Sequence, residues 1–330
     1  MHRRTLLTAL AASGLTPAAL RAQAFPSGPL RLVVPYPAGG GIDAVARYLA
    51  QGLGEELKQV VNVENKGGAG GTLGADAAAK APADGHTLLL AGNPELTIAP
   101  ALFGKLPYAP LADFTPLVLV AQSPSVLVSA PLSASGARTL REALAAAGKR
   151  GGIPIGTPGN GSPQHLAVEL LRAGTGLDIV HVPYKGAAPA TLAALSGETA
   201  FALVGAPPTR PHLASGKLQA WAVTQARRSP LLPEVPTLRE ALGSASTQPG
   251  SDEDLVAWYG LLAPARTPAD VAQRLERAAL AVLARSEARA RLAALGTDDL
   301  ALPAKAFAER MKAETQRSAE LIKRFGIKPD

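Results

Sequence analysis

Short runs of apolar residues alternate along the chain with longer segments whose hydrophobic positions recur every three or four residues. Residues 30–36 predict a buried strand, and the spacing from Val45 to Leu57 predicts a helix that begins near Asp43. Strands alternating with helices are typical of α/β proteins with parallel sheets. The pattern continues with strands predicted over 60–64, 87–91, 117–120, 126–129, 153–156, 179–182, 199–204, 218–224 and 255–262, and helices over 75–80, 139–147, 164–173, 189–195, 269–283 and 304–325.

The composition is that of a folded protein of about two domains. The chain has 330 residues, of which 47% are hydrophobic and 18% are charged, and this balance excludes an intrinsically disordered protein. It contains no cysteine, which excludes disulfides, thiolate metal sites, cysteine nucleophiles and a lipidated N-terminal cysteine. With only five histidines, the sequence gives no reason to expect a metal centre, and we expect no cofactor.

The charge points to small anions rather than to nucleic acid. The formal net charge is +7, and three arginines without any acid in the first 24 residues leave +4 for the rest of the chain. We find no cluster of lysine and arginine, and aromatic residues make up only 4% of the chain. Binding to nucleic acid usually needs such a cluster or stacking aromatic residues, so we expect no nucleic-acid partner.

The first 24 residues predict an export signal. A basic start is followed by a modestly apolar stretch and by the cleavage pattern Ala22-Gln23-Ala24, so the mature chain is expected to begin at Phe25. The pair Arg3-Arg4 followed by Thr5-Leu6-Leu7 resembles a twin-arginine signal, and the ordinary secretory route is the alternative. No later stretch reaches 18 apolar residues, so the sequence predicts a periplasmic protein without a membrane span.

A glycine-rich loop follows the first predicted strand. Gly39, Gly41 and Ala44 match the G-x-G-x-x-A pattern of dinucleotide-binding proteins, and Glu64 ends the next strand where a ribose-binding acid is expected. An exported NAD- or flavin-linked enzyme is therefore one hypothesis, although Pro35 and Pro37 interrupt the usual passage from strand to glycines. The loop is also compatible with a plain tight turn. The interpretation we favour is anion binding by free backbone N–H groups at a helix N-terminus.

A second predicted helix start and the end of a later predicted strand also offer candidate ligand-binding groups. Ser162 is placed as an N-cap with Pro163 at the first helical position, which predicts either a second anion site or a simple cap. A nucleophilic Ser162 with His165 is disfavoured, because the hydroxyl already serves as an acceptor and no G-x-S-x-G elbow is present. The histidines His165, His181 and His212 lack metal spacing and are expected to be structural. In residues 182–186, Tyr184 and the backbone after it are better candidates than Lys185.

Affinity arithmetic favours a cleft between two lobes. A micromolar dissociation constant requires about −8 kcal/mol, whereas one helix terminus supplies at most about 2 kcal/mol. Two opposed helix termini, each adding charge-assisted hydrogen bonds of roughly 1.5–3 kcal/mol, could supply the difference.

Five motifs in order make the chain resemble the Bug family of periplasmic solute receptors, which serve tripartite tricarboxylate transporters. They are LRLVVPYPAGGGID (30–43), VVNVENKGGAGGTLGADAAAKAPADGHTLLL (60–90), GTPGNGSPQHLAVEL (156–170), HVPYKGAAPA (181–190) and GKLQAWAVTQARRSPLLPEVPTL (216–238). The resemblance implies an α/β type II periplasmic-binding-protein fold. Its two lobes are joined by a hinge that the chain crosses twice, near Ser123-Pro124 and near Thr224. Lobe one would comprise residues 25–123 and 225–330, and lobe two residues 124–224.

The resemblance also implies a function. Such a receptor, here expected to be a monomer, binds a small carboxylate between its lobes and delivers it to a membrane permease without catalysing a reaction. A sensory receptor that reports its ligand to a signalling system is a further hypothesis. The residues expected to bind the ligand are Tyr36, Pro37, Gly39, Gly40, Gly41, Asp43, Asn93, Asn160, Gly161, Ser162, His165, Tyr184, Lys185, Gly186 and Val204.

Some positions depart from the family pattern. Ile42 replaces a hydroxyl residue, the loop from Ser244 to Asp254 is longer than typical, and residues 92–95 lack the usual Thr/Ser pattern. Where the family often has Phe-Asp, this chain has Leu203-Val204. From the loss of that carboxylate we predict a ligand with an apolar or aromatic tail rather than an α-amino group.

Overall fold

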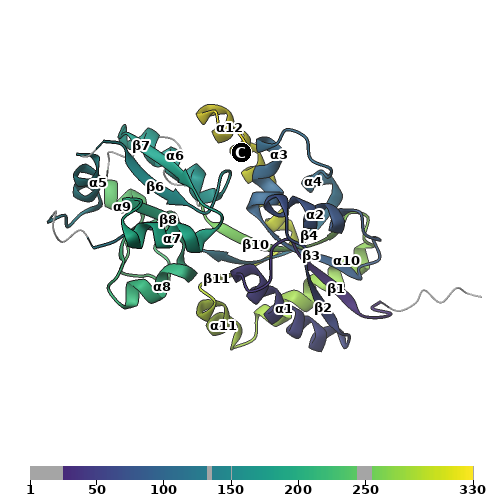
Figure 1. Ribbon diagram of the computed structural model, residues 1–330. Helices are drawn as coiled ribbons and strands as arrows, with labels where there is room; N and C mark the ends of the chain where they lie inside the picture. Colours follow the sequence, from purple (N-terminus) through teal and green to yellow (C-terminus); the bar gives the residue numbers. More distant parts are fainter. Residues whose placement is uncertain (1–24, 132–135, 150, 244–254, 330) are drawn as a thin grey trace, which may run out of the picture.

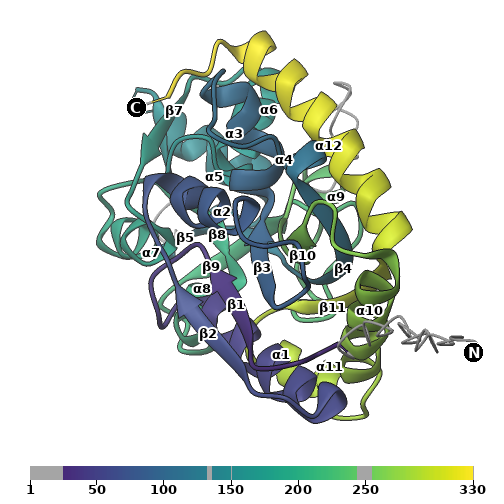
Figure 2. The ribbon, with the colours of Figure 1, turned by 90° about the vertical axis from the view of Figure 1, so that its right-hand side faces the viewer.

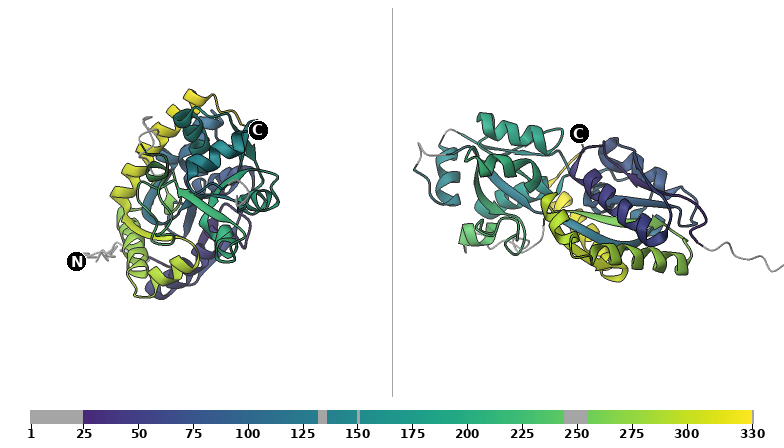
Figure 3. Two further views of the ribbon diagram at one scale, coloured as in Figure 1. Left: turned by 90° about the vertical axis from the view of Figure 1, so that its left-hand side faces the viewer. Right: turned by 90° about the horizontal axis from the view of Figure 1, so that it is seen from below.

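Two α/β lobes lie side by side in the computed structural model (Figure 1; Figure 3, right), which describes residues 25–131, 136–149, 151–243 and 255–329. The predicted export signal, residues 1–24, and the loop from Ser244 to Asp254 lie outside the described residues. Each lobe is built on one sheet, with strand order β11-β4-β10-β3-β1-β2 in the first and β7-β6-β8-β5-β9 in the second.

The strands of the first sheet are β1 (Leu30–Val34), β2 (Val61–Asn65), β3 (Thr87–Gly92), β4 (Phe114–Ser123), β10 (Ala257–Pro264) and β11 (Asp298–Pro303). Those of the second are β5 (Ser125–Ser129), β6 (Ile153–Thr157), β7 (Ile179–Pro183), β8 (Phe201–Gly205) and β9 (Gln219–Val223). The helices around the first sheet are α1 (Gly41–Leu57), η1 (Ala69–Gly71), α2 (Thr72–Ala79), η2 (Pro94–Ile98), α3 (Ala99–Leu102), α4 (Pro110–Asp113), α10 (Ala269–Leu283), α11 (Ala288–Ala294) and α12 (Ala304–Phe325). The second lobe has α5 (Leu140–Gly148), α6 (Pro163–Thr175), α7 (Ala187–Ser196), α8 (Ala206–Ala214) and α9 (Leu238–Leu242).

Both sheets are mixed, so the α/β class is confirmed whereas the parallel arrangement holds only in part. Strand β1 pairs in parallel with β2 and β3, and β6 with β7 and β8, while β10 runs antiparallel to β3 and β4. The reason is the connection between the lobes. Strand β4 leaves the first sheet at Ser123 and β10 enters it at Ala257, directly opposite Ser123, so the two strands run in opposite directions.

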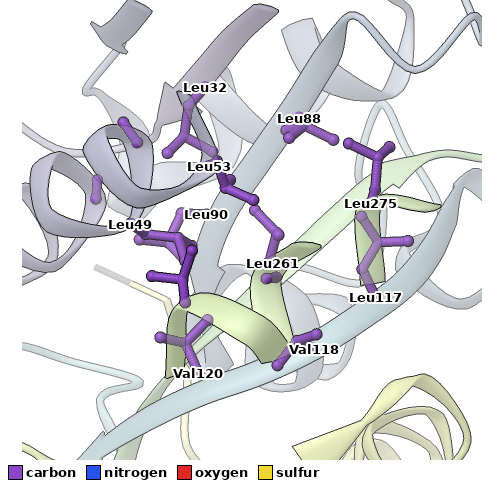
Figure 4. Close-up of a cluster of buried hydrophobic side chains, with 14 of the residues drawn as sticks. Leu32, Leu49, Leu53, Leu88, Leu90, Leu117, Val118, Val120, Leu261 and Leu275 are labelled. Carbon is purple, nitrogen blue, oxygen red and sulfur yellow. The ribbon is translucent and has the colours of Figure 1, made fainter. Parts of the chain in front are cut away.

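The core explains why the central strands are apolar on both sides. In β1, Leu32 and Val34 pack into a cluster with α1 and α10, whereas Val33 between them packs on the opposite face with Trp258 and Phe307. Successive strand residues point to opposite faces, so a sheet covered by helices on both faces needs an uninterrupted hydrophobic run. Figure 4 shows the cluster under α1, with leucines from β1, β3, β4 and β10 meeting those of α1 and α10.

The two segments that the sequence analysis expects to cross between the lobes lie next to each other. Strand β4 ends at Ser123 and β5 begins at Ser125, and the Thr224 main-chain N donates to the Ser125 carbonyl at 3.0 Å. The Thr224 hydroxyl also donates to the carbonyl of Leu255, which leads into β10, at 2.7 Å. The segment after Thr224 nevertheless packs on the second lobe through Leu232, Val235, Leu238 and Leu242. We therefore propose that the second lobe extends as far as Leu242 rather than ending at Thr224.

Helix α12 joins the lobes on a second side. It runs along the first lobe toward α3 and α6 (Figure 2), and its end contributes Leu321 and Ile322 to a cluster with Ile98 and Leu102 of the first lobe and Leu170 of the second. Among the described residues, no helix combines the length and apolar character needed to cross a bilayer.

Candidate ligand-binding site

A cavity of about 710 Å³ lies between the lobes. The first lobe lines it with the segment after β1, the start of η2, helix α3 and strand β10, and the second lobe with the loop after β6 and the starts of α7 and α8. This volume falls within the range of pockets that enclose small organic ligands. The expected site residues that line it are Tyr36, Pro37, Gly39, Gly40, Gly41, Asn93, Asn160, Gly161, Ser162 and Gly186.

The other expected site residues do not line the cavity. These are Asp43, His165, Tyr184, Lys185 and Val204.

The first-lobe loop presents the beginning of α1 to the cavity. Its N-cap, Gly40, has no side chain that could occupy the amides of the first turn, and Gly39 adopts a φ of 88° that favours glycine. Asp43 braces this loop from behind, because its buried carboxylate accepts hydrogen bonds from the Gly39 amide at 2.9 Å, from Arg47 at 3.0 Å and from Asn65 at 3.0 Å. Burial alone would raise the pKa of Asp43, but these hydrogen bonds hold it below its ordinary value.

The second-lobe loop presents the beginning of α6. Ser162 caps this helix, accepting from the His165 amide at 3.1 Å and donating to the Gly159 carbonyl at 2.8 Å. The capping interpretation is therefore confirmed, and the hydroxyl is engaged on both sides. His165 accepts from the Gly161 amide through Nδ1 at 3.1 Å, and its ring stacks on that of His181 at 3.7 Å between centroids. His165 thus holds the loop in place from behind.

The third segment contributes its backbone rather than its side chains. The Tyr184 hydroxyl donates to Glu198 at 2.8 Å outside the cavity, whereas Gly186, the N-cap of α7, lines the cavity with Ala187. The Gly186 amide donates to the Pro158 carbonyl at 2.9 Å, which ties this helix start to the second-lobe loop.

The structure does not support a ligand-facing side chain at position 204. Val204 has no exposed surface and packs in the second-lobe core with Val126 and Val128, so it cannot report the polarity of a ligand tail. Its neighbour Gly205 lines the cavity instead, as the N-cap of α8. The expectation failed because side chains on a strand alternate between faces, so the sequence alone did not fix which of two neighbours faces the cleft.

Strand β10 supplies a side chain that the sequence analysis missed. Tyr259 lines the cavity, whereas its neighbour Trp258 has no exposed surface and packs in the core with Phe307. The Tyr259 hydroxyl lies beside the start of α1, 3.4 Å from the position that a Cβ on Gly41 would occupy. It has no hydrogen-bond partner among the described residues and is not fully enclosed, so it can donate to a ligand there. Burial raises the pKa of Tyr259 to about 12, with a further contribution from Glu95, so the hydroxyl keeps its proton.

Helix termini dominate the electrostatics of the cavity. None of the described residues that line the cavity carries a charged side chain. Four helices instead place their N-cap residues in the cavity wall: Gly40, Ser162, Gly186 and Gly205. The partial positive charge of these ends favours an anion. Helix α8 differs from the other three, because Pro207 and Pro208 in its first turn have no N–H and present apolar rings to the cavity.

The dinucleotide interpretation receives no support from this geometry. Glu64 lies outside the cavity wall, partly exposed, and pairs with Arg31 at 3.2 Å. Among the described residues, no group of three or more histidines or acids is arranged to hold a metal ion.

Comparisons with known proteins agree with this arrangement. Residues 45–327 match the model of the tripartite tricarboxylate transporter family receptor. The chain is 35% identical over 270 residues to the protein BugT of Bordetella pertussis, covering 81% of this chain and 80% of BugT. An R. palustris protein solved with adipate superimposes with a TM-score of 0.81 at 29% identity, covering 93% of this chain and 100% of that one. MatC from Rhodopseudomonas palustris, solved with bound malate, gives 0.74 at 32% identity, covering 90% and 100%.

The structure has the two expected lobes, and helix starts line the cavity between them. The family model also matches most of the described residues. The chain belongs to the family of tripartite tricarboxylate transporter receptors, the Bug family that its motifs resemble.

Proposed function

We propose that this receptor captures a small carboxylate in the cavity between its lobes and delivers it, as a monomer, to the permease of a tripartite transporter. Residues 1–24 would direct its export to the periplasm, where it would meet both partners. The observation that carries the proposal is the convergence of four helix N-termini from both lobes on one cavity whose described lining residues are uncharged.

The magnitudes support capture by both lobes together. One helix terminus contributes at most about 2 kcal/mol, whereas micromolar binding needs about −8 kcal/mol. A carboxylate at the start of α1 could add a hydrogen bond from Tyr259, and donors of the second lobe would supply the remainder. Ligand would then bind the closed arrangement better than an open one and shift the population toward it.

The cavity favours a carboxylate with an apolar body. Pro207, Pro208 and Phe103 line part of its wall, and no aspartate or glutamate among the described lining residues is available to accept an α-ammonium group. Two relatives were solved with adipate and with malate, and neither acid has an amino group.

Thermal unfolding tests the proposal. Protein freed of co-purified ligand by unfolding and refolding is heated with adipate, malate, benzoate and glutamate separately. We expect at least one of the first three acids to raise Tm, since a ligand at about 100 times its Kd adds about 2.7 kcal/mol. No shift with any of the acids would contradict the proposal, and tight glutamate binding would contradict the ligand class.

Two tyrosine variants locate the site. Replacing Tyr259→Phe removes a hydroxyl from the cavity wall and should weaken binding about tenfold or more, the value of one hydrogen bond to a charged group. The matched control is Tyr48→Phe, which removes a hydroxyl from α1 outside the cavity wall and should leave Kd unchanged.

A further inference from the structure

A buried carboxyl group lies directly behind the cavity wall. Glu95, in η2, has no exposed surface. Its Oε2 accepts a hydrogen bond from the Tyr36 hydroxyl at 2.6 Å, and its Oε1 accepts one from the Gly92 amide at 2.7 Å. Both Tyr36 and Gly92 line the cavity, so a single layer of protein separates this carboxyl from the space that a ligand would occupy.

Hydroxyl groups face the Glu95 carboxyl group directly, and no cationic side chain contacts it among the described residues. The tyrosines that face it are Tyr36, Tyr259 and Tyr108, and Tyr108 donates to the Glu95 main-chain carbonyl at 2.7 Å. Gly71 closes the remaining side, since a Cβ there would lie 3.1 Å from Oε2. Glu95 forms no ion pair with any residue in the described part of the chain. The other ionisable residues nearby are Asp76 of α2, Asp113 of α4, and Arg310, Glu314 and Arg317 in the middle of α12, which packs along η2.

Such an environment disfavours the charged form of a carboxyl group. Burial raises the pKa of Glu95 to about 7, and the hydrogen bonds from Tyr36 and Gly92 act in the opposite direction without cancelling it. Both forms are therefore populated near neutral pH. A carboxylate bound on the other side of the wall carries the same charge as ionised Glu95 and would disfavour that form further.

We propose that Glu95 couples ligand capture to a proton: when a carboxylate enters the cavity of a molecule in which Glu95 is ionised, one proton moves from solvent to the Glu95 carboxylate. The inference rests on the proposed function of the same cavity. The neutral carboxyl group can donate its hydrogen to the Tyr36 oxygen, which leaves the hydrogen of the Tyr36 hydroxyl available to the cavity side. Tyr36 remains a phenol throughout, because burial and Glu95 hold its pKa well above the ordinary value.

The coupling makes affinity depend on pH in one direction. Simple carboxylates are already ionised at pH 6, so the ligand itself takes up little of the proton change between pH 6 and pH 8. Comparison with Glu95→Gln isolates the part that belongs to Glu95. For a ligand that raises the pKa of Glu95 by about one unit, Kd should increase on the order of fivefold over this range.

A first experiment needs no ligand. Wild type, Glu95→Gln and Glu198→Gln are unfolded with urea at pH 6 and at pH 8. Because the pKa of Glu95 is raised in the folded protein, the stability that its neutral form contributes is lost as the pH rises through about 7. Between pH 6 and pH 8, we expect the free energy of unfolding of wild type and of Glu198→Gln to fall more than that of Glu95→Gln. Glu198 is the matched control, because it accepts from Tyr184 in an exposed pair at 2.8 Å. An identical pH dependence in all three would overturn the inference, whatever the ligand.

A second experiment measures the proton itself. Adipate and malate are titrated calorimetrically into each protein at pH 6, 7 and 8, with buffers of different ionisation heat at pH 7. We expect proton uptake and a rising Kd in wild type and Glu198→Gln, and neither in Glu95→Gln. Binding without either effect in wild type would refute the coupling and leave the proposed function intact. If neither acid binds at any pH, the coupling fails together with capture of these acids, while the unfolding data still establish the charge of Glu95.

Discussion

Gly161 lies where the second-lobe loop touches the first lobe, and an alanine there tests whether ligand binding needs the lobes this close. A Cβ at this position would lie 2.3 Å from Cδ2 of Leu102, a buried residue of α3, so either Leu102 must move or the lobes must separate. Overpacking of this kind costs about 1–3 kcal/mol. Gly161 also has a φ of 70°, and an L-residue in that region costs about 1–2 kcal/mol more.

Gly176 separates these two costs. It ends α6 with a φ of 66°, and a Cβ there would meet nothing within 4 Å, so Gly176→Ala carries the backbone cost alone. If the closed arrangement is the one that binds, Gly161→Ala should weaken binding by about 1–3 kcal/mol beyond Gly176→Ala, which is roughly 5- to 150-fold in Kd.

The assay is calorimetric titration with an acid that stabilises wild type, alongside urea unfolding of each variant. Leu102→Ala is included because removing Cδ2 relieves the contact, so the double variant Gly161→Ala/Leu102→Ala should bind better than Gly161→Ala. Equal affinities for Gly161→Ala and Gly176→Ala would refute the reasoning, as would a double variant that recovers nothing.

Three further changes test the supports of the site. Ser162→Ala removes the α6 cap and should cost about 1 kcal/mol of stability and weaken ligand binding, whereas Thr139→Ala, which removes the cap of α5 away from the cavity, should cost a similar amount and leave Kd unchanged. Asp43 contributes stability above its ordinary pKa that is lost as the pH falls through its lowered folded value, so Asp43→Asn should flatten the acid limb of the unfolding curve; an unchanged limb would contradict this. Leu170→Ala should cost about 2–5 kcal/mol in urea unfolding and increase the radius of gyration measured by small-angle scattering, and an unchanged radius would mean that the cluster at the end of α12 does not hold the lobes together.

One strand, β11, and one helix, α8, that the sequence analysis did not predict lack the local pattern of their element type. Strand β11 (Asp298–Pro303) is half-buried at the edge of its sheet and begins with two acids, so it lacks the apolar run of a central strand. Helix α8 begins with two prolines and contains Pro211, which the local pattern assigns to a loop. Both elements are stabilised by contacts with segments distant in the chain.

The amino-acid sequence by itself determined the features that depend on neighbouring residues. The strand-glycine-helix segments around Gly40 and Ser162 were predicted with their helix starts, whereas the helix after Gly186 was predicted to begin at residue 189 and begins at Ala187. All three residues line the cavity. Caps and tight turns are local, since an N-cap acceptor, a missing N–H or a positive φ concerns only a few successive residues.

Only the tertiary structure decided which side chains meet. It turned Val204 into the core and Gly205 toward the cavity, and it brought Tyr259 beside the start of α1 although more than 200 residues separate them in the sequence. It also enclosed Glu95 among Tyr36, Gly71 and Gly92, which removes water from the carboxyl group without supplying a positive charge. Desolvation and distance depend on how remote segments pack against one another, and no local pattern in the chain encodes them.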